Sequence, residues 1–369
     1  MPDPTSPLPL GRPATVRDVA QRAEVSTATV SRVLTGNKPV TPEIRRRVQQ
    51  AMKELDYVVN EQARALTVNT SRTVAILLAN LTWPFHNRVA HGIEQEAVAQ
   101  NLACLVATTM GDPEREMAQV ELLRARNTDA IVLIGGVVDT PEYRERITHL
   151  ARSLDAKGSR LVLCGRPAPA PDLPVTVVDY DNEGGAYAAT SHLLSLGHRR
   201  IAFLGGMPGH TTVEARLTGY RRAHHDYHVE VDPALVLTQQ PLGQTNRGFA
   251  RETIHAMTLA AAGGPLPFTA LFCFDDITAA GAVSALRDAA VDVPRDVSVI
   301  GFNDEPTALD VFPQLSTVHV PHVELGRTAL RLALGRNDLM NRDTGQHVVL
   351  GTHLVMRHSV APLLPDRRT

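Results

Sequence analysis

Long hydrophobic runs are missing from this sequence of 369 residues, although 43% of its residues are apolar. The longest apolar stretches, such as TVAILLAN and ALFCF, have the length of a strand and fall far short of the roughly 20 residues that cross a bilayer. The opening stretch MPDPTSPLPLGRP also lacks the apolar core of an export signal. We therefore expect a cytoplasmic protein without membrane contact, large enough to form two or three domains.

Cysteine is scarce, and the motifs of common enzymes are missing. Cys104, Cys164 and Cys273 each lie in an apolar, strand-like run, which favours buried thiols over disulfides or metal ligands. There is no phosphate loop ending in Gly-Lys-Ser/Thr, no Gly-x-Ser-x-Gly and no His-Glu-x-x-His. The histidines of HHDYH at 224–228 fit a solvated helical face better than a metal site, because no acidic or cysteine cluster completes their ligand set. The sequence thus predicts no enzyme, no cofactor and no metal.

A large net charge is also absent, but the total of −2 hides an asymmetry. Residues 12–72 hold 11 Lys and Arg against 6 Asp and Glu, an excess of +5, which leaves −7 for the rest of the chain. A basic head on an acidic body is typical of a polyanion-binding module joined to another domain. A solvated basic face would have the same composition.

The stretch from residue 15 to residue 36 predicts two short helices separated by a tight turn. Thr15 with Asp18 can cap the first helix, whose apolar residues recur on one face. Ser26 can cap the second helix, and Gly36 would end it. The first helix would bury Val16, Val19, Ala20 and Ala23, and the second would bury Val30, Val33 and Leu34 while turning Thr27, Ala28, Thr29, Ser31 and Arg32 outward.

A third helix is predicted from Thr41 and Pro42 onward, with an apolar stripe and a basic flank. Two short helices backed by a third make a helix-turn-helix, whose second helix fits the DNA major groove. The short side chains of Thr27 and Ala28 would permit close approach to base edges, and Arg32 could reach guanine or phosphate. A three-helix packing module without nucleic acid remains the alternative.

The run TVRDVAQRAEVSTATVSRVLTGNKPVTPEIRRRVQQAMKELDYVVNEQARAL closely resembles the DNA-binding head of the lactose repressor (LacI/GalR) family of bacterial transcription regulators. The resemblance continues through DNEGGAYAATSHLLSLGHRRIAFLGG, VSVIGFNDEPTALDVFPQLSTV and LVMRHSV, and so covers about residues 15–360. It implies a homodimeric repressor, with a tetramer possible, that binds a palindromic operator in double-stranded DNA at the nucleoid. A small-molecule effector, a sugar or related metabolite, would either release the repressor from the operator or hold it on the operator. The DNA-binding residues expected on this basis are Thr15, Ser26, Thr27, Ala28, Thr29, Ser31, Arg32, Asn37, Lys38, Ala63 and Leu66.

The stretch NEQARAL at 60–66 resembles the family's hinge helix, which forms only on operator DNA. The resemblance implies that Leu66 wedges into the minor groove and kinks it. One or two turns are too short to persist as an isolated helix, so a partner must order them. Val59 stands where the family usually has proline. An ordinary linker with Leu66 packed on the body is the alternative.

Beyond residue 73, strand-sized apolar runs alternate with helix-sized amphipathic segments, which predicts parallel sheets covered by helices. The expected fold class is α/β, with an all-α helix-turn-helix head joined by a hinge helix to a two-lobed body that resembles a periplasmic binding protein. The expected strands are 73–79, 102–108, 130–134, 160–164, 175–178, 200–204, 270–274 and 297–302. The expected divisions are a disordered tail 1–14, the head 15–59, the hinge 60–72, a body 73–360 and a disordered tail 361–369, with the lobes at 73–166 plus 301–322 and at 167–300 plus 323–360.

Ligands of such sheets lie beyond the carboxyl ends of the strands. By resemblance, Asp276 and Arg216 match the family's main hydroxyl-binding carboxylate and guanidinium, and Arg166 and Asp179 match further effector positions. By the same resemblance, Trp83, Phe85 and His86 lie where the family often has aromatic residues of this site, although for Trp83 lobe packing is equally plausible. The alternatives are that Asp276 caps the helix starting at Ile277 and that Arg216 forms a surface ion pair.

Other functions have to be weighed against a repressor. A stand-alone sugar-binding or transport protein would explain the body but not the head, and an enzyme would need a catalytic constellation that the sequence does not display. A regulator whose effector is a corepressor, or one that activates transcription, is equally compatible with the sequence.

Overall fold

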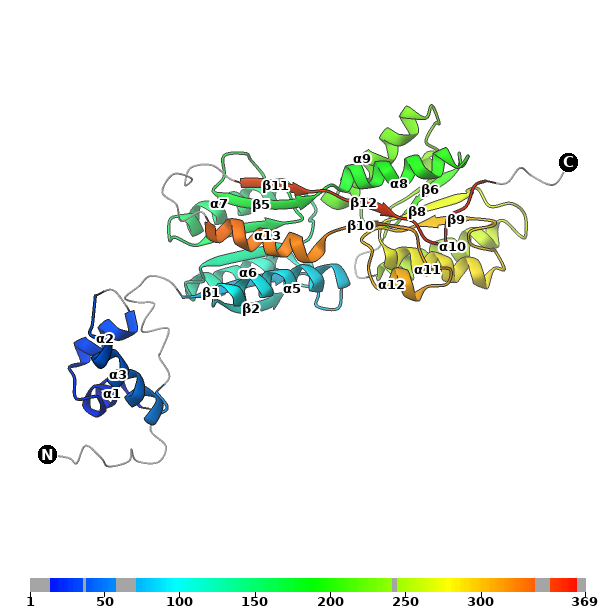
Figure 1. Ribbon diagram of the computed structural model, residues 1–369. Helices are drawn as coiled ribbons and strands as arrows, with labels where there is room; N and C mark the ends of the chain where they lie inside the picture. The colour runs from blue at the N-terminus through cyan, green and yellow to red at the C-terminus, as the bar shows by residue number, and fades with distance from the viewer. Residues whose placement is uncertain (1–13, 36–37, 58–70, 241–243, 336–345, 364–369) are drawn as a thin grey trace. The chain divides into compact units, whose positions relative to one another are not determined.

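The computed structural model describes residues 14–35, 38–57, 71–240, 244–335 and 346–363 (Figure 1). The chain divides into two compact units, one ending at residue 71 and the other beginning at residue 72. No helix in the described ranges is long and apolar enough to cross a membrane.

The described part of the first unit folds into the three predicted helices: α1 (Val16–Arg22), α2 (Thr27–Thr35) and α3 (Pro42–Glu54). Thr15 caps α1 reciprocally with Asp18, because its own amide donates to the Asp18 carboxylate at 2.7 Å. The hydroxyl of Ser26 accepts from the amide of Thr29 at 3.2 Å at the start of α2. The local capping signals in the sequence are therefore confirmed.

A small apolar core holds the three helices together, as the helical spacing predicts. Its buried members are Val19, Ala20, Ala23, Val30, Val33, Val48 and Ala51. Arg47 of α3 also donates to the carbonyl of Ala23 at 2.6 Å, which fastens α3 to the turn between α1 and α2. The predicted helix end at Gly36, the site residues Asn37, Ala63 and Leu66, and nearly all of the predicted hinge and N-terminal tail lie outside the described residues.

The second unit contains two parallel sheets. The first has the strand order β11-β5-β4-β3-β1-β2, and the second has the order β7-β6-β8-β9. The strands of the first sheet are β1 (Thr73–Leu78), β2 (Ala103–Thr108), β3 (Ala130–Ile134), β4 (Arg160–Cys164), β5 (Val175–Tyr180) and β11 (Gln346–Leu350). Those of the second are β6 (Ile201–Leu204), β7 (Val236–Leu237), β8 (Ala270–Cys273) and β9 (Ser298–Ile300). A separate antiparallel pair joins β10 (Thr317–His319) to β12 (His353–Val355).

Helices cover both faces of each sheet, as the alternating pattern predicts. The helices of the first lobe are α5 (Pro84–Ala99), α6 (Pro113–Ala125), α7 (Pro141–Asp155) and α13 (His322–Gly335). Those of the second are α8 (Asn182–Ser195), α9 (Thr211–Asp226), α10 (Asn246–Ala260), α11 (Asp276–Asp288) and the short α12 (Thr307–Asp310), with a 3-10 turn at Pro233–Leu235. Alternate residues of β1 face opposite cores, because a strand turns successive side chains to opposite faces.

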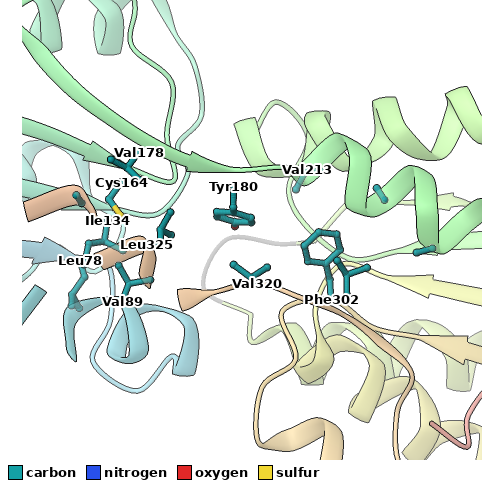
Figure 2. Packing of buried hydrophobic residues seen from close by; sticks show 14 of the residues in the cluster. Leu78, Val89, Ile134, Cys164, Val178, Tyr180, Val213, Phe302, Val320 and Leu325 are labelled. Atoms are coloured by element: carbon teal, nitrogen blue, oxygen red, sulfur yellow. The ribbon is translucent and has the colours of Figure 1, made fainter. Parts of the chain in front are cut away.

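One apolar cluster continues from the first sheet to the second (Figure 2). Tyr180, at the end of β5, and Val320 lie in the middle of this cluster, between residues such as Val178 of the first lobe and Phe302 of the second. Their burial joins the two lobes through side chains as well as through the backbone.

The expected lobe bounds are wrong in three places. Residues 175–180, expected in the second lobe, supply β5 to the first, and the described residues of 323–350, also expected in the second lobe, supply β11 and all but the first residue of α13 to the first. Ala308 and Leu315, expected in the first lobe, are buried in the core of the second. An apolar strand pattern does not tell which sheet the strand joins, because that choice depends on contacts far apart in sequence.

The expected C-terminal tail also begins too early. The amide of Ala361 donates to the hydroxyl of Ser298 at 3.0 Å, and the amide of Leu363 donates to the carbonyl of Leu196 at 2.9 Å. These residues are therefore held against the second lobe.

Candidate functional site

The outward side of α2 carries the short polar side chains that the sequence predicts. Ser26, Thr27, Ala28, Ser31 and Arg32 are exposed, whereas Thr29 is half-buried and its hydroxyl lies 2.9 Å from that of Ser26. Thr15 and Lys38 are exposed as well. This helix therefore presents small side chains and one guanidinium to the solvent, a surface that suits close approach to base edges.

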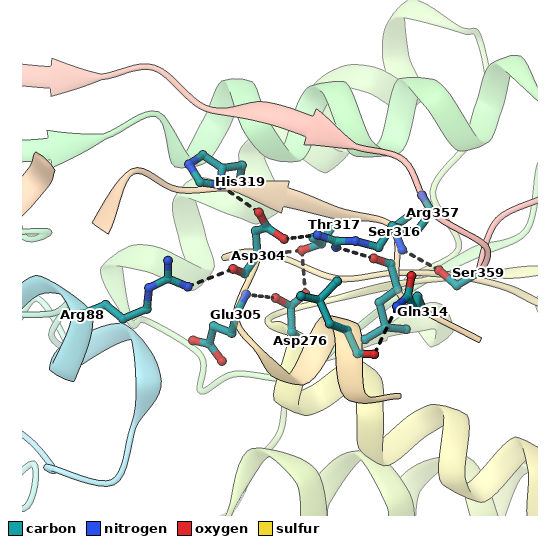
Figure 3. A network of polar contacts seen from close by, with 12 residues as sticks. Arg88, Asp276, Asp304, Glu305, Gln314, Ser316, Thr317, His319, Arg357 and Ser359 are labelled. Atoms are coloured by element: carbon teal, nitrogen blue, oxygen red, sulfur yellow. Dashed lines mark hydrogen bonds and ion pairs between the residues drawn. The ribbon is translucent and has the colours of Figure 1, made fainter. Parts of the chain in front are cut away.

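Asp276 lies at the first position of α11 and is fully buried. The helix cap is Asp275, so the alternative that Asp276 caps this helix is wrong. The Asp276 carboxylate accepts from the Thr317 hydroxyl at 2.6 Å and from the Glu305 amide at 2.7 Å (Figure 3). Burial raises the pKa of Asp276 to about 8. The side chain is thus an acid held neutral near pH 7.

Arg216 of α9 is 1% exposed, which excludes the surface ion pair. Its guanidinium stacks 3.6 Å from the centre of the Phe302 ring. It donates to Asn182 at 3.0 Å, to Asn303 at 3.2 Å, to the Tyr180 hydroxyl at 3.3 Å and to the Phe274 carbonyl. Burial lowers its pKa. Arg216 and Asp276 are both anchored to the loop at 303–305 rather than hydrogen-bonded to each other.

The other two charged residues expected at this site are engaged elsewhere. Arg166 donates to the carbonyl of Gly135 at 2.7 Å and forms an ion pair with Glu116 at 3.2 Å. Asp179 accepts from the amide of Tyr180 at 2.8 Å, and burial raises its pKa. In the structure both side chains therefore support the first sheet, and Arg166 also contributes positive charge nearby.

Phe85 connects the first lobe to the polar residues around Arg216. Its ring centre lies 5.2 Å from that of His322, 5.5 Å from that of Tyr180 and 5.7 Å from that of His86. Tyr180 in turn accepts a hydrogen bond from Arg216. Trp83 is half-exposed and stacks on the His86 ring at 5.2 Å. Aromatic and charged groups thus meet between the lobes.

Four polar side chains in this region share one feature, and three of them, His210, His322 and Glu305, are not predicted from the sequence; the fourth is His86. Each has a buried polar atom with no hydrogen-bond partner among the described residues, and His322 has two such atoms. Burial lowers the pKa of His322 to about 3 and those of His86 and His210 to about 4. No spacing in the sequence singles these residues out, because their burial and missing partners arise only from the tertiary fold.

The two lobes also touch on either side of these residues. A β-bridge pairs Val138 with His210, and the Thr211 amide donates to the Val137 carbonyl at 2.8 Å. Arg88 of α5 donates to the carbonyl of Asp304 at 3.3 Å (Figure 3). A change at these contacts would therefore alter how the lobes pack on each other.

The buried Glu305 gives a pH-dependent stability. Burial raises its pKa to about 8 from an ordinary value near 4.5, so the stability it contributes is complete below the ordinary value and is lost as pH rises through about 8. We expect Glu305→Gln to gain stability relative to the parent between pH 5 and pH 8, as measured by urea unfolding at both values. Glu145→Gln, at an exposed position of α7, is the control. A Glu305→Gln difference that is the same at both pH values would contradict the expectation.

The comparisons with known proteins agree with this architecture. Residues 15–60 match the bacterial regulatory proteins of the lacI family, and residues 190–360 match a periplasmic binding protein-like domain. The chain is 32% identical to the HTH-type transcriptional regulator DegA of Bacillus subtilis (strain 168), over 95% of this chain and 98% of that protein. It is 31% identical to the HTH-type transcriptional repressor PurR of Aliivibrio fischeri (strain ATCC 700601 / ES114), over 94% and 98%.

Solved structures have the same fold. The transcriptional regulator CelR in complex with cellobiose aligns over 94% of this chain and 99% of its own, with a TM-score of 0.66 and 29% identity. The lac repressor dimer bound to operator and the anti-inducer ONPF aligns over 95% and 100%, with a TM-score of 0.77 and 22% identity. The curated relatives are transcription regulators rather than enzymes, and they match nearly their whole length. The chain belongs to the LacI family of bacterial transcription regulators.

Proposed function

We propose that this protein is a homodimeric repressor, with a tetramer possible, that acts in the cytoplasm on a palindromic operator at the nucleoid. Its affinity for the operator would be controlled by a small molecule, a sugar or related metabolite, held between the two lobes. The observation that carries the proposal is the pairing of an exposed recognition helix with buried, unpartnered polar groups in the body. Two of the similar proteins support the proposal: PurR is named a transcriptional repressor, and CelR forms a complex with the sugar cellobiose.

On the DNA side, α2 enters the major groove with Thr27, Ala28 and Arg32 against the base edges. Phosphate contacts fix its register. The other proposed contacts in the head are Thr15, Ser26, Thr29, Ser31, Asn37 and Lys38. Ala63 and Leu66 contact the minor groove, where Leu66 wedges between base steps.

Dimer formation is supported by apolar side chains around the edge strand β2. Val106 on the strand, Met110 just after it and Val98 near the end of α5 are all at least half-exposed. An edge strand with exposed apolar neighbours is a typical site of association. Two heads on one dimer would contact the two halves of a palindrome.

On the effector side, the proposed site between the lobes consists of Arg216 and Asp276 with Phe85, His322 and Glu305. A ligand that supplies partners to the unsatisfied atoms changes the contacts between the lobes, and thereby the geometry of the two heads. Arg166 and Asp179 support the site from the first sheet.

The experiment that tests this function is selection from sheared genomic DNA by the purified full chain at about 150 mM salt. We expect the retained fragments to share a palindrome with a flexible central step, and the neighbouring genes to indicate the class of effector. Retention of DNA without a shared sequence would contradict specific operator binding.

A charge placed on α2 should abolish specific binding. We expect Ala28→Glu to weaken binding to the selected operator about 100-fold or more, because a carboxylate would face base edges and phosphates. Gln49→Glu makes the same change of charge at an exposed position of α3 and should weaken binding by a much smaller factor. Fluorescence anisotropy with labelled operator measures both. Equal losses in the two variants would exclude α2 as the recognition helix.

A further inference from the structure

Three histidine rings from separate segments gather around Phe85 and the turn after β3. His86 and His322 lie against the Phe85 ring. A Cβ at Gly135 would lie 2.6 Å from Nε2 of His86, and a Cβ at Gly136 would lie 2.6 Å from Cε1 of His210. Two adjacent glycines thus let the His86 and His210 rings approach the same turn, and the His322 ring packs on Phe85.

These imidazoles have spare hydrogen-bonding capacity. Nδ1 of His86, Nδ1 of His210 and both ring nitrogens of His322 have no hydrogen-bond partner among the described residues. His86 is only 5% exposed and His322 only 2%. Buried polar atoms are nearly always partnered, so this concentration of unpartnered nitrogens indicates a ligand.

The charges that act on the three rings are mainly positive. Besides burial, Arg166 and Arg216 lower the pKa of His210, and Arg166 and the neighbouring His210 lower that of His86. The pKa of His322 is lowered by Arg88, His319 and Arg216 and raised by Asp304 alone. The positive charges come from arginines, Arg88 and Arg216 for His322 and Arg216 with the Glu116-paired Arg166 for His210, and they attract an anion.

The charge of Arg216 is not balanced by a bound carboxylate. All four acceptors of its hydrogen bonds, in Asn182, Asn303, Tyr180 and Phe274, are uncharged. Among the nearby carboxyl groups, burial raises the pKa values of Asp276 and Glu305 to about 8. Asp275 attracts Arg216 through space and raises its pKa, but its hydrogen bonds are to Thr278 and Asn246 rather than to the guanidinium. A buried guanidinium without a paired anion is costly, and an anionic ligand would supply one.

We propose that the effector carries an anionic group, a carboxylate or a phosphate, that is bound by His86, His210 and His322 beside Arg216. The inference rests on the proposed function, because it assigns a chemical class to the effector of that site. Each neutral imidazole has one N–H and donates to the anion in the tautomer with the hydrogen on its unpartnered nitrogen, which for His86 and His210 replaces the bond to the backbone of Asn80 or Gly136. The free oxygen of Glu305 is available to a hydroxyl group of the same ligand. A sugar acid or a sugar phosphate fits this arrangement.

Calorimetry on the full chain without DNA at pH 7 tests the inference with four probes: glucose, gluconate, glucose 6-phosphate and inorganic phosphate. We expect at least one of the sugar anions to bind at least tenfold more tightly than glucose and to raise Tm. Preference for gluconate identifies a carboxylate, and preference for glucose 6-phosphate with a response to inorganic phosphate identifies a phosphoryl group. Glucose binding as tightly as both sugar anions, or no response to any of the three anions, overturns the proposal.

Two matched variants place the anion at the histidines. His322→Phe keeps an aromatic ring against Phe85 but removes both nitrogens, and we expect it to weaken anion binding at least tenfold without lowering the Tm of the free protein. The ring nitrogens of His198 are both partnered, by Thr269 and by the Ala361 carbonyl at 3.0 Å each. His198→Phe should therefore lower Tm and leave anion affinity unchanged. Undiminished anion binding by His322→Phe overturns the assignment.

The two proposals fail separately. A protein that selects a palindrome but binds glucose as tightly as the two sugar anions retains the proposed function and loses this inference. A protein that binds the anions but selects no operator sequence retains the anion site and loses the repressor function.

Discussion

Replacing Gly326 by alanine is expected to lower the free energy of unfolding by about 2–4 kcal/mol. A Cβ at Gly326 of α13 would lie 2.1 Å from the carbonyl oxygen of Val89 in α5 and 2.9 Å from the amide nitrogen of Ile93. Gly92 of α5 meets the carbonyl oxygen of Val323 at the same distance. The obstructing atoms belong to backbone, so the two helices must move apart and open the core beneath them.

Gly335→Ala provides the control on the same helix. No atom of the described residues comes within 4 Å of a Cβ at Gly335. Alanine is the better helix former, so this variant should be neutral or slightly stabilising. Urea unfolding monitored by circular dichroism compares the two variants. A similar free energy of unfolding for both would show that the close approach of α5 and α13 costs little to relieve.

The second large effect is expected from Arg216→Ala, which should lower the free energy of unfolding by about 3–5 kcal/mol, because several buried acceptors lose their donor at once. The substitution removes the donors to Asn182, Asn303, Tyr180 and the Phe274 carbonyl. Most of these hydrogen bonds are buried. Buried acceptors left without donors carry their full desolvation penalty. The stacking on the Phe302 ring is lost as well. We expect the lobes to unfold at a markedly lower urea concentration.

Arg222→Ala changes the same residue type on the same helix. Arg222 is half-exposed, forms an ion pair with Glu183 and stacks on the Tyr187 ring. Exposed pairs of this kind contribute less than about 1 kcal/mol. If Arg222→Ala destabilised the protein as much as Arg216→Ala, the burial of the Arg216 network would not be the cause.

Features set by neighbouring residues could be predicted from the sequence. The caps at Thr15 and Thr41 and the apolar faces of α1 to α3 depend on spacing of three or four residues, and the structure has them as expected. The longer strands of both sheets were found from their apolar runs. The strands β7, β10, β11 and β12 were missed because they are very short or largely exposed, and short segments carry too little pattern.

The site was predictable only where the family resemblance extends to single residues. Arg216 and Asp276 are both buried and both bonded to the loop at 303–305, which has no signal in the sequence, and their role in effector binding stays a prediction. The strand before Arg166 and the strand containing Asp179 are both present as predicted. The side chains themselves bond elsewhere, Arg166 to the carbonyl of Gly135 and Asp179 to the amide of Tyr180. The proposed role of His322 rests on the absence of hydrogen-bond partners for its ring nitrogens among the described residues, and only the folded structure reveals that absence.

The glycine contacts between α5 and α13 have a mechanical consequence. At Gly92 and Gly326 the two helices touch through backbone atoms, which cannot shift as a flexible side chain can. Phe85 and His86 lie at the start of α5, and His322 is the first residue of α13. We therefore expect the two helices to move as one rigid unit, with the unpartnered histidines His86 and His322 at their N-terminal ends. Both helices pack on the first sheet, whose first strand in the sequence, β1, begins at Thr73, shortly after the first unit ends at residue 71.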